Sequence, residues 1–337
     1  MRIISTLRPT SRRLIRIPAL IWLFTAHFSL FARVDRAAAE SVDGSPASAS
    51  LSGQPVEATL DMQVELHRRG FSCGSIDGVL GEQTVAALRA FQRRSGIAAT
   101  GLLDAPTQEC LRLSGPVLGK YTFTVTDLAG LQPVPDTWLG KSLLSNLGYE
   151  SALELASERH HASPALIRQL NPGIDWAAIV PGTLILVPAV ERVVVGGTAA
   201  GIRIQLAVRE LQLIDSAGSV IAQFPVSIAR LVDKRPVGNL HVTTIVTNPE
   251  YTFDPDSYPE SAEGKALGRT LVLPPGPNNP VGLAWIGLDR PGYGIHGTPD
   301  PENIGRTESH GCFRLANWDA LTLVGQARLG MLVNVEP

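Results

Sequence analysis

The stretch IRIQLAVRELQLI, residues 202–214, decides the fold class of the C-terminal part of the chain. Apolar side chains alternate with other residues from Ile202 to Val208, which is the period of a β-strand with one buried face. The alternation resumes on the opposite parity at Leu211, so a tight hairpin or a bulge is expected between Val208 and Leu211. This part of the chain is therefore predicted to be rich in β-strands.

Long connections follow this strand pattern. Prolines interrupt the chain repeatedly between residues 236 and 280, and only ANWDALTLVGQARLG, residues 316–330, has the spacing of a helix. Asn317 is the expected N-cap of this helix, and Gly330 is expected to close it. We expect a β-rich domain with a large loop region over residues 195–337.

Residues 58–113 have the spacing of helices instead. Met62 and Leu66 lie four residues apart on one expected helix, and Leu88 lies on the buried face of a second. Asp104 is the expected N-cap of a third helix. Three short helices in about 55 residues make only a small core.

Residues 119–190 contain both strand patterns and helix patterns. The pattern predicts a strand over residues 121–125, helices over 153–159 and 163–170, and a final strand within 171–188. The fold class is therefore multidomain α+β, with a small three-helix domain, an α/β segment and a C-terminal β-rich domain.

The first 39 residues have the composition of a signal peptide. Five arginines and no acid precede a mostly apolar run over residues 17–32, and alanines at 37–39 supply small residues for cleavage. An uncleaved membrane anchor is the alternative, but this run is short against the ~20 residues that a spanning helix needs. We expect export to the periplasm or cell envelope, with residues 40–57, rich in Ser, Ala, Gly and Pro, as a linker.

The charge balance argues against a nucleic-acid partner. The chain has 29 Lys and Arg and 31 Asp and Glu, but seven of the arginines and one aspartate lie within residues 1–39. The remainder carries 22 basic and 30 acidic side chains, a net charge of −8. Nucleic-acid binding depends on basic surface, so that class of function is not expected.

The chain has three cysteines, and an oxidising compartment favours pairing of an even subset. Cys73 and Cys110 lie in the same small helical domain, so a disulfide between them is expected. Closing their 37-residue loop would contribute roughly 4 kcal/mol on the chain-entropy model. Cys312 is left as a thiol, which favours a use for its nucleophilicity, although a buried structural cysteine is the alternative.

The stretch RTESHGCFRL, residues 306–315, places Cys312 behind His310 and Gly311, with His296 sixteen residues upstream. A free thiol has a pKa of about 8.5, and an adjacent imidazole can take its proton and hold the ion pair. We therefore expect Cys312 to be a nucleophile and His296 its base. The backbone N–H groups of Gly311 and Cys312, or the His310 ring, are expected to stabilise the oxyanion that forms.

Four blocks of sequence in this half resemble the catalytic domain of the L,D-transpeptidases of the YkuD type. The blocks are KRPVGNLHV at 234–242, PPGPNNPVGLAWIGL at 274–288, IHGT at 295–298 and ESHGCFRL at 308–315. The resemblance runs from about residue 202 to residue 335 and implies a cysteine nucleophile, Cys312, and a proton donor and acceptor, His296. Other motif residues would support the site: His310 and Gly311 at the oxyanion, and Ser309 and Arg314 at the substrate peptide.

Enzymes of this family cleave the bond between the third residue and the terminal D-alanine of a tetrapeptide stem, then transfer the acyl group to an amine. The resemblance thus implies peptidoglycan stem peptides and glycan as partners, with an amine-bearing wall protein as another acceptor, and a role in wall organisation and cell shape. It implies no cofactor and no metal. In such families a backbone carbonyl orients the histidine, so no acid is expected as a third catalytic member.

The N-terminal segments carry two further resemblances. Residues 58–113 are similar to the three-helix peptidoglycan-binding domain through GF at 70–71, IDG at 76–78, FQ at 91–92 and TG at 100–101. Residues 119–190, with LIRQLNP at 166–172 and VPGTLILVP at 180–188, are similar to a LysM module, from which a long insertion at 126–150 departs. A spacer without ligand is the alternative for both segments.

Four alternatives concern the site. His296, His310 and Cys312 are all potential zinc ligands, although His310 and Cys312 are separated by one residue only. Arg314 could pair with an acid such as Asp319 instead of binding substrate. The domain could have lost activity and serve only to bind the wall. Finally, the thioester could pass to water or to a wall protein, giving an L,D-carboxypeptidase or an attachment or detachment enzyme.

Overall fold

The computed structural model describes residues 58–190, 193–306 and 311–337. The predicted signal peptide and linker lie outside these ranges, and so do Ser309 and His310. Within the described ranges, no helix combines the length and the apolar character that crossing a membrane would need.

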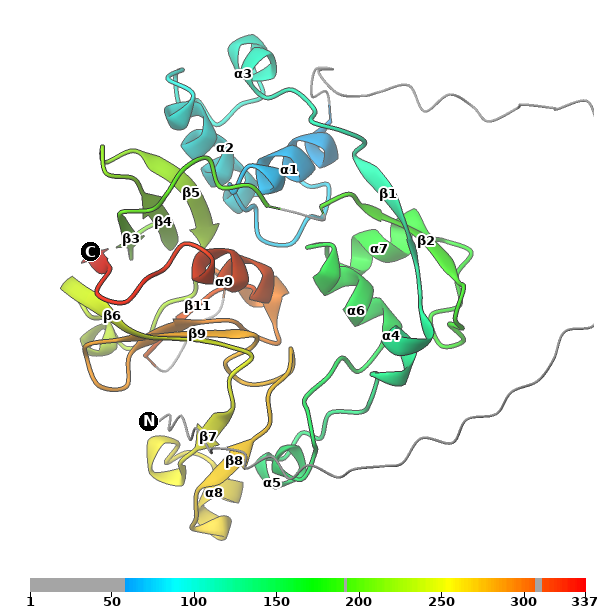
Figure 1. Ribbon diagram of the computed structural model, residues 1–337, viewed down its shortest axis with the longest axis vertical. Helices are drawn as coiled ribbons and strands as arrows, with labels where there is room; N and C mark the ends of the chain where they lie inside the picture. Colours follow the sequence, from blue (N-terminus) through cyan, green and yellow to red (C-terminus); the bar gives the residue numbers. More distant parts are fainter. Residues whose placement is uncertain (1–57, 191–192, 307–310) are drawn as a thin grey trace, which may run out of the picture. The chain divides into compact units, whose positions relative to one another are not determined.

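The three predicted N-terminal helices are present as α1 (Thr59–Arg68), α2 (Glu82–Arg94) and α3 (Ala105–Cys110), in the upper part of Figure 1. Asp104 is the N-cap of α3, as predicted, because its side chain accepts a hydrogen bond from the backbone N–H of Thr107. The helices pack around one buried apolar cluster: Met62, Leu66, Phe71, Cys73, Ala87, Leu88, Ala90, Phe91, Leu111 and Leu113.

The predicted disulfide between Cys73 and Cys110 is not formed in the structure, which has both residues as free thiols. Cys73 is buried, and its Sγ lies 4.0 Å from the carbonyl oxygen of Phe71. Cys110 packs at the margin of the same cluster. The two cysteines thus share one core without a bond, and pairing under oxidising conditions stays a prediction.

The middle segment has the predicted order of strand, helix, helix and strand. Its elements are β1 (Leu118–Thr122), α6 (Ala152–Arg159), α7 (Pro164–Leu170) and β2 (Leu184–Pro188), and the two strands pair antiparallel. The first strand was expected to continue to Val125 and instead ends at Thr122. The reason is local, because Thr124 and Asp127 form a capping box that starts a helix, α4 (Val125–Ala129).

The insertion at 126–150 packs against the C-terminal domain. It carries α4 and α5 (Trp138–Ser142), and α5 lies beside strand β8 (Leu271–Leu273) in Figure 1. The backbone N–H groups of Trp138 and Leu139 donate to the carboxylate of Glu263 at 2.9 and 2.8 Å. The Trp138 ring stacks on Phe253, with 4.3 Å between centroids.

In the described residues of the C-terminal part, eight strands form one sheet in the order β11-β10-β9-β6-β12-β3-β4-β5. Their bounds are β3 (Gly201–Gln205), β4 (Glu210–Ile214), β5 (Val220–Pro225), β6 (Gly238–Thr247), β9 (Ala284–Leu288), β10 (Gly294–His296), β11 (Phe313–Arg314) and β12 (Leu332–Glu336). β10 pairs parallel with β11, β12 pairs parallel with β3, and the remaining neighbours are antiparallel.

The long proline-rich connections carry short elements. β7 (Tyr251–Phe253) pairs with β8 in a separate two-stranded sheet, with α8 (Ala262–Leu267) between them. Single 3₁₀ turns lie in the described parts of the connections at Val232–Lys234, Pro255–Ser257 and Pro301–Asn303.

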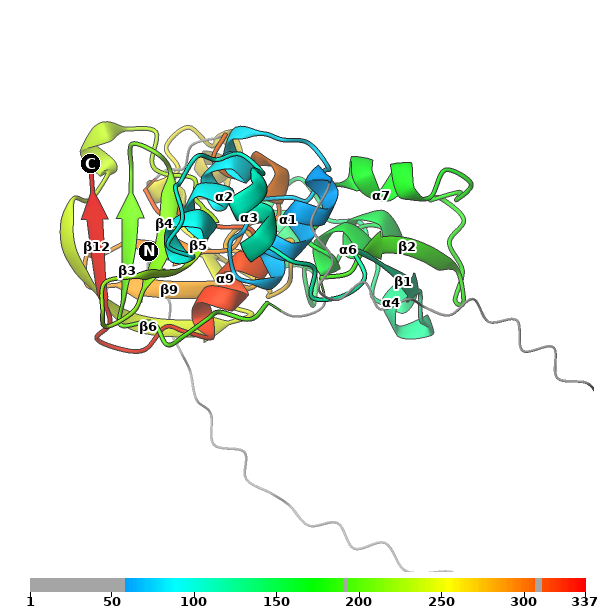
Figure 2. The same ribbon diagram turned by 90° about the horizontal axis from the view of Figure 1, so that it is seen from above.

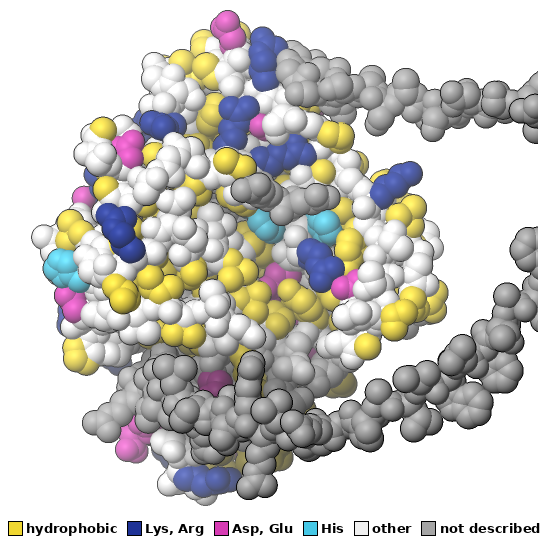
Figure 3. Space-filling model, viewed as in Figure 1, with side chains coloured by type: hydrophobic (Ala, Val, Ile, Leu, Met, Phe, Trp, Pro, Cys, Tyr) yellow, Lys and Arg dark blue, Asp and Glu magenta, His cyan; other side chains and the backbone are white. Residues whose placement is uncertain are grey.

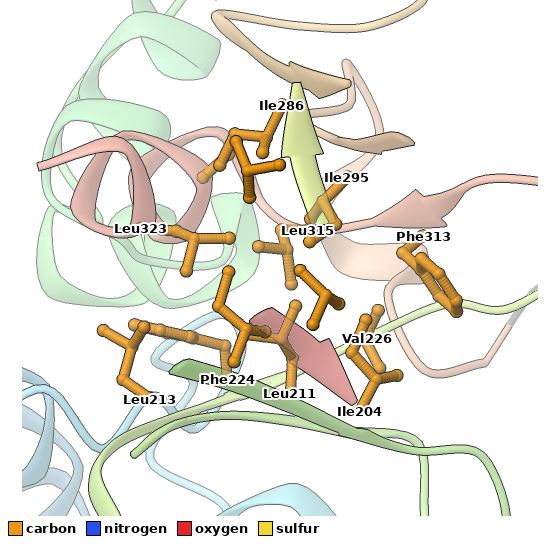
Figure 4. Close-up of a cluster of buried hydrophobic side chains, with 14 of the residues drawn as sticks. Ile204, Leu211, Leu213, Phe224, Val226, Ile286, Ile295, Phe313, Leu315 and Leu323 are labelled. Atoms are coloured by element: carbon orange, nitrogen blue, oxygen red, sulfur yellow. The ribbon is translucent and has the colours of Figure 1, made fainter. Parts of the chain in front are cut away.

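The opening stretch forms the predicted hairpin. β3 and β4 pair so that Ile202 faces Leu213 and Ile204 faces Leu211. Arg209 ends the turn at a positive φ of 54°. Figure 4 shows the resulting core, in which side chains from these strands meet Phe224 of β5 and residues of β9, β10 and β11.

The outer edge of β5 is covered by the helical domain. The backbone of Phe71 forms a β-bridge to Gln223, and the N–H of Ser72 donates to the Gln223 carbonyl at 2.8 Å. Figure 2 shows the helices α1, α2 and α3 on this side of the sheet. Backbone groups at a sheet edge would otherwise be unpaired, so this contact joins the two domains.

The C-terminal helix corrects two predictions. α9 (Asn317–Val324) has Ala316 as its N-cap instead of Asn317, and Gly325 as its C-cap instead of Gly330. The Asn317 side chain does not cap the helix. It bonds away from α9, accepting from the backbone N–H groups of Leu283 and Thr298.

Candidate active site

Cys312 and His296 are brought together by two parallel strands at one edge of the sheet. His296 is the last residue of β10 and Cys312 immediately precedes β11. The register pairs Ile295 with Phe313 and His296 with Arg314. Continuing this register by one residue places Cys312 opposite Gly294, so Cys312 lies at the start of the strand that pairs with the strand of His296.

His296 is held in one orientation by its surroundings. Its side chain is buried, and Nδ1 lies 2.6 Å from the carbonyl oxygen of Gly297, which can only accept. Nδ1 therefore carries the proton, and Nε2 is left to accept one. The indole of Trp285 stacks on the imidazole, with 5.7 Å between centroids and 22° between planes.

Gly294 makes room for that stacked indole. A Cβ at position 294 would lie 2.6 Å from two ring carbons of Trp285 and 3.0 Å from the carbonyl oxygen of Ile286. The absence of a side chain there lets Trp285 occupy the space behind His296. Gly294 thus accommodates the neighbouring ring.

The electrostatics favour a neutral imidazole and a neutral thiol. Burial, with a smaller effect of the Arg314 charge, lowers the pKa of His296 to about 3. Burial raises the pKa of Cys312 to about 11, although the backbone of Gly294 and the Arg314 charge act in the opposite direction. Both shifts favour the neutral forms over the thiolate–imidazolium pair that the sequence predicts, and the pair stays a prediction. Nε2 is the position at which the neutral imidazole accepts a proton.

The thiol lies at the margin of an aromatic cluster that sequence reasoning did not find. Cys312 packs against a group that includes Tyr251, Phe253 and Trp285, and its Sγ donates to the Gly292 carbonyl at 3.4 Å. The hydroxyls of Tyr251 and Tyr258 lie 2.6 Å apart. The sequence signal for this aromatic cluster is the concentration of aromatic residues in the stretch YTFDPDSY, residues 251–258.

Arg314 contributes a positive charge beside the thiol. Its backbone N–H and C=O both bond to Ser227 at 3.0 Å, which anchors β11. Its charge acts on the pKa values of both Cys312 and His296. The acid considered as its partner, Asp319, is buried and accepts a hydrogen bond from Ser72 at 2.9 Å instead.

The remaining motif residues divide between described and undescribed parts of the chain. Gly311 is partly buried, and no described atom lies within 4 Å of the position that a Cβ would take there. Ser309 and His310 lie outside the described residues, so their roles at the substrate and the oxyanion stay predictions.

Other features of the described residues lie away from this pair. No group of three or more His, Cys, Asp or Glu able to hold a metal is present among the described residues, which do not include His310. Cavities of 470 and 1330 Å³ are lined by residues other than Cys312 and His296. On the face shown in Figure 3, basic side chains are scattered among acidic, polar and apolar ones.

Two sequence families match this chain. Residues 200–335 match the family described as "L,D-transpeptidase catalytic domain", and residues 56–111 match the family described as "Putative peptidoglycan binding domain". The catalytic match contains both Cys312 and His296. Neither match covers the middle segment, so its similarity to a LysM module stays a prediction.

The chain is also similar to individual proteins that are named L,D-transpeptidases. "Putative L,D-transpeptidase YkuD" of Bacillus licheniformis is 24% identical over 188 residues, which is 56% of this chain and 94% of that protein. A solved L,D-transpeptidase from Mycobacterium smegmatis aligns with 40% of this chain at 16% identity and a TM-score of 0.32, and the chain spans 58% of its length. A solved L,D-transpeptidase from Xylanimonas cellulosilytica aligns with 84% of this chain and 95% of its own at 15% identity and a TM-score of 0.35.

The catalytic match contains all four sequence blocks that carry the resemblance, from residue 234 to residue 315. The matched blocks contain a cysteine and a histidine on adjacent strands, with a backbone carbonyl orienting the histidine, as the sequence resemblance implied. Residues 200–335 are therefore a YkuD-type L,D-transpeptidase catalytic domain, from a family of acyltransferases, and residues 56–111 are a peptidoglycan-binding domain ahead of it.

Proposed function

We propose that the protein is an exported enzyme that cross-links peptidoglycan through a thioester on Cys312. The observation that carries the proposal is the bond from His296 Nδ1 to the Gly297 carbonyl, which leaves Nε2 as a base on the strand next to the thiol. Export to the periplasm or cell envelope and a role in cell shape are parts of this proposal.

The reaction has two halves. In the first, His296 takes the proton of Cys312 while the sulfur attacks the carbonyl of the third stem residue, and the same proton passes to the amine of the departing D-alanine. In the second, the amine of another stem attacks the thioester, and the sulfur leaves as a thiol. The amide that forms replaces the amide that was broken, so no cofactor is consumed.

Three groups would support these steps. The backbone N–H groups of Gly311 and Cys312, with the ring of His310, would bind the oxyanion. The positive charge of Arg314 suits a carboxylate of the stem peptide, since the acid considered as its partner is bonded to Ser72. The peptidoglycan-binding domain would hold the enzyme on the wall.

The decisive experiment incubates the mature chain with a disaccharide–tetrapeptide and identifies the products by mass. Cross-linked dimers are expected, together with a transient adduct on the peptide that contains Cys312. Cys312→Ser should fold normally and lose nearly all product, because a hydroxyl is a much weaker nucleophile than a thiolate.

The same assay separates the competing functions. Tripeptide without dimer would identify an L,D-carboxypeptidase, and product that forms only when a wall protein is added would identify an attachment enzyme. If wild-type protein yields no product and no adduct, or if Cys312→Ser turns over at the wild-type rate, the thioester mechanism is wrong.

A further inference from the structure

Two glutamates of α6 bond to asparagines of the catalytic domain in the same way. Glu154 Oε1 accepts from Asn278 Nδ2 at 2.7 Å, and Glu158 Oε1 accepts from Asn317 Nδ2 at 2.6 Å. The two glutamates lie four residues apart, so they occupy one face of the helix. In Figure 1, α6 lies next to α9, the helix that Asn317 begins.

Asn317 has a partner for every hydrogen-bonding direction that its amide offers. Its oxygen accepts from Leu283 N at 2.9 Å and from Thr298 N at 3.1 Å. Its nitrogen donates to Glu158 at 2.6 Å and to the Pro277 carbonyl at 3.3 Å. The residue has no exposed surface. A buried amide with these bonds has a single favourable orientation.

The loop that Asn317 holds is the one that orients the catalytic histidine. Gly297 lies between His296 and Thr298, and its carbonyl accepts the bond from His296 Nδ1 at 2.6 Å. A Cβ at position 297 would lie 2.2 Å from the Asn317 side-chain oxygen. The direction of the Gly297 carbonyl therefore depends on the peptide that Asn317 anchors at Thr298.

We propose that Glu158, in the middle segment, is a positioning residue for His296 and acts through Asn317. Its carboxyl oxygen holds the amide nitrogen, so the amide oxygen faces the two backbone N–H groups of the catalytic loop. Without Glu158, the nitrogen keeps only the longer bond to Pro277, and the anchor of the loop is loosened. The middle segment would then contribute to catalysis by holding the base in place, in addition to any contact with the wall.

Glu154 provides a matched control. It lies one turn earlier on the same helix and bonds to Asn278, whose amide nitrogen also donates to the Gly148 carbonyl at 2.8 Å. These contacts dock the middle segment on the catalytic domain without touching the loop at 297–298. A change at Glu154 therefore weakens docking, whereas a change at Glu158 weakens docking and positioning together.

The test compares Glu158→Ala, Glu154→Ala, Glu158→Gln and Asn317→Ala in the mature chain. The readouts are the rate at which iodoacetamide modifies Cys312, followed by peptide mass, and the thermal unfolding midpoint. We expect Glu158→Ala to slow modification roughly tenfold, toward the rate of His296→Ala, because misplacing a catalytic group by a fraction of an ångström has effects of this size. Glu154→Ala should stay within about twofold of wild type although its midpoint also falls.

Two comparisons show whether Glu158 acts through Asn317. Glu158→Gln keeps an oxygen that can accept the same bond, so it should modify Cys312 at close to the wild-type rate. In the Asn317→Ala background, adding Glu158→Ala should change the rate of Cys312 modification little, because the hydrogen bond between the two side chains is already absent. If Asn317→Ala does not fold, the contrast among the other three variants decides the question.

Equal slowing by Glu154→Ala and Glu158→Ala would overturn the proposal, and so would full additivity of Glu158→Ala with Asn317→Ala. The inference rests on the proposed function, but the alkylation readout does not need turnover. A wild-type protein that forms no product would therefore refute the proposed function, while the alkylation rates would still test the link from Glu158 to His296.

Discussion

The Nδ1 atom of His296 lies 2.6 Å from the carbonyl oxygen of Gly297, the next residue in the chain. A backbone group thus sets the tautomer of the base, a role that an acid has in the serine-protease triad. Because this carbonyl brings no negative charge to the imidazole, burial keeps the pKa of His296 low, at about 3. The imidazole is consequently neutral at physiological pH, with Nε2 unprotonated.

The pH dependence of Cys312 alkylation should differ between wild type and His296→Ala. With the pKa of Cys312 raised to about 11, a variant without the base should react about tenfold faster per pH unit from pH 7 to 10, as thiolate accumulates. Wild type should react faster at pH 7 and depend less on pH, because neutral His296 accepts the proton within the site. The difference in alkylation rate between the two proteins should become smaller as pH approaches 11. If the two rates instead rise in parallel with pH, His296 is not the base.

Gly294→Ala should displace the Trp285 indole that stacks on His296. The new methyl group would lie 2.6 Å from the Trp285 ring, so the indole that stacks on His296 must move. We expect a loss of about 1–3 kcal/mol in the free energy of unfolding, measured by denaturant titration, and a lower transpeptidation rate. Gly173→Ala is the control, because no described atom lies within 4 Å of its Cβ position. Equal behaviour of the two variants would show that Gly294 is not needed for packing.

Stability should fall as pH rises through the range in which Glu158 ionises. Burial raises the pKa of Glu158 from 4.5 to about 8, so between these values the folded protein keeps a proton that the unfolded chain releases. The free energy of unfolding should therefore decrease from pH 5 to pH 8, and Glu158→Gln should remove part of that decrease. Denaturant titrations at the two pH values measure it. The same decrease in both proteins would show that Glu158 ionises at its ordinary pKa when folded.

Peptide mapping under non-reducing conditions should find Cys73 joined to Cys110 in protein isolated from an oxidising compartment. Both residues belong to the cluster of the three-helix domain, which places them in one small core. Cys312 should remain in its thiol form, because its chemistry requires the thiol. A mapped disulfide that contains Cys312 would exclude the thioester mechanism for that form of the protein.

The sequence by itself was sufficient for features that depend on neighbouring residues. The period of two in residues 202–214 predicted the hairpin of β3 and β4, because strand periodicity is a local property. Asp104 was identified as a helix cap for the same reason. The motifs around Cys312 and His296 predicted a nucleophile and a base, and the structure pairs the two strands that carry these motifs.

Only the tertiary structure decided how these residues are held. Asn317 has the sequence context of a helix cap, yet its amide bonds Glu158, which is 159 residues away along the chain. Likewise, Trp138 of the insertion stacks on Phe253, and Trp285 stacks on His296. Such contacts arise when separate segments pack into one interior, where each buried polar group must find a partner. No local period or motif records which distant residue that partner will be.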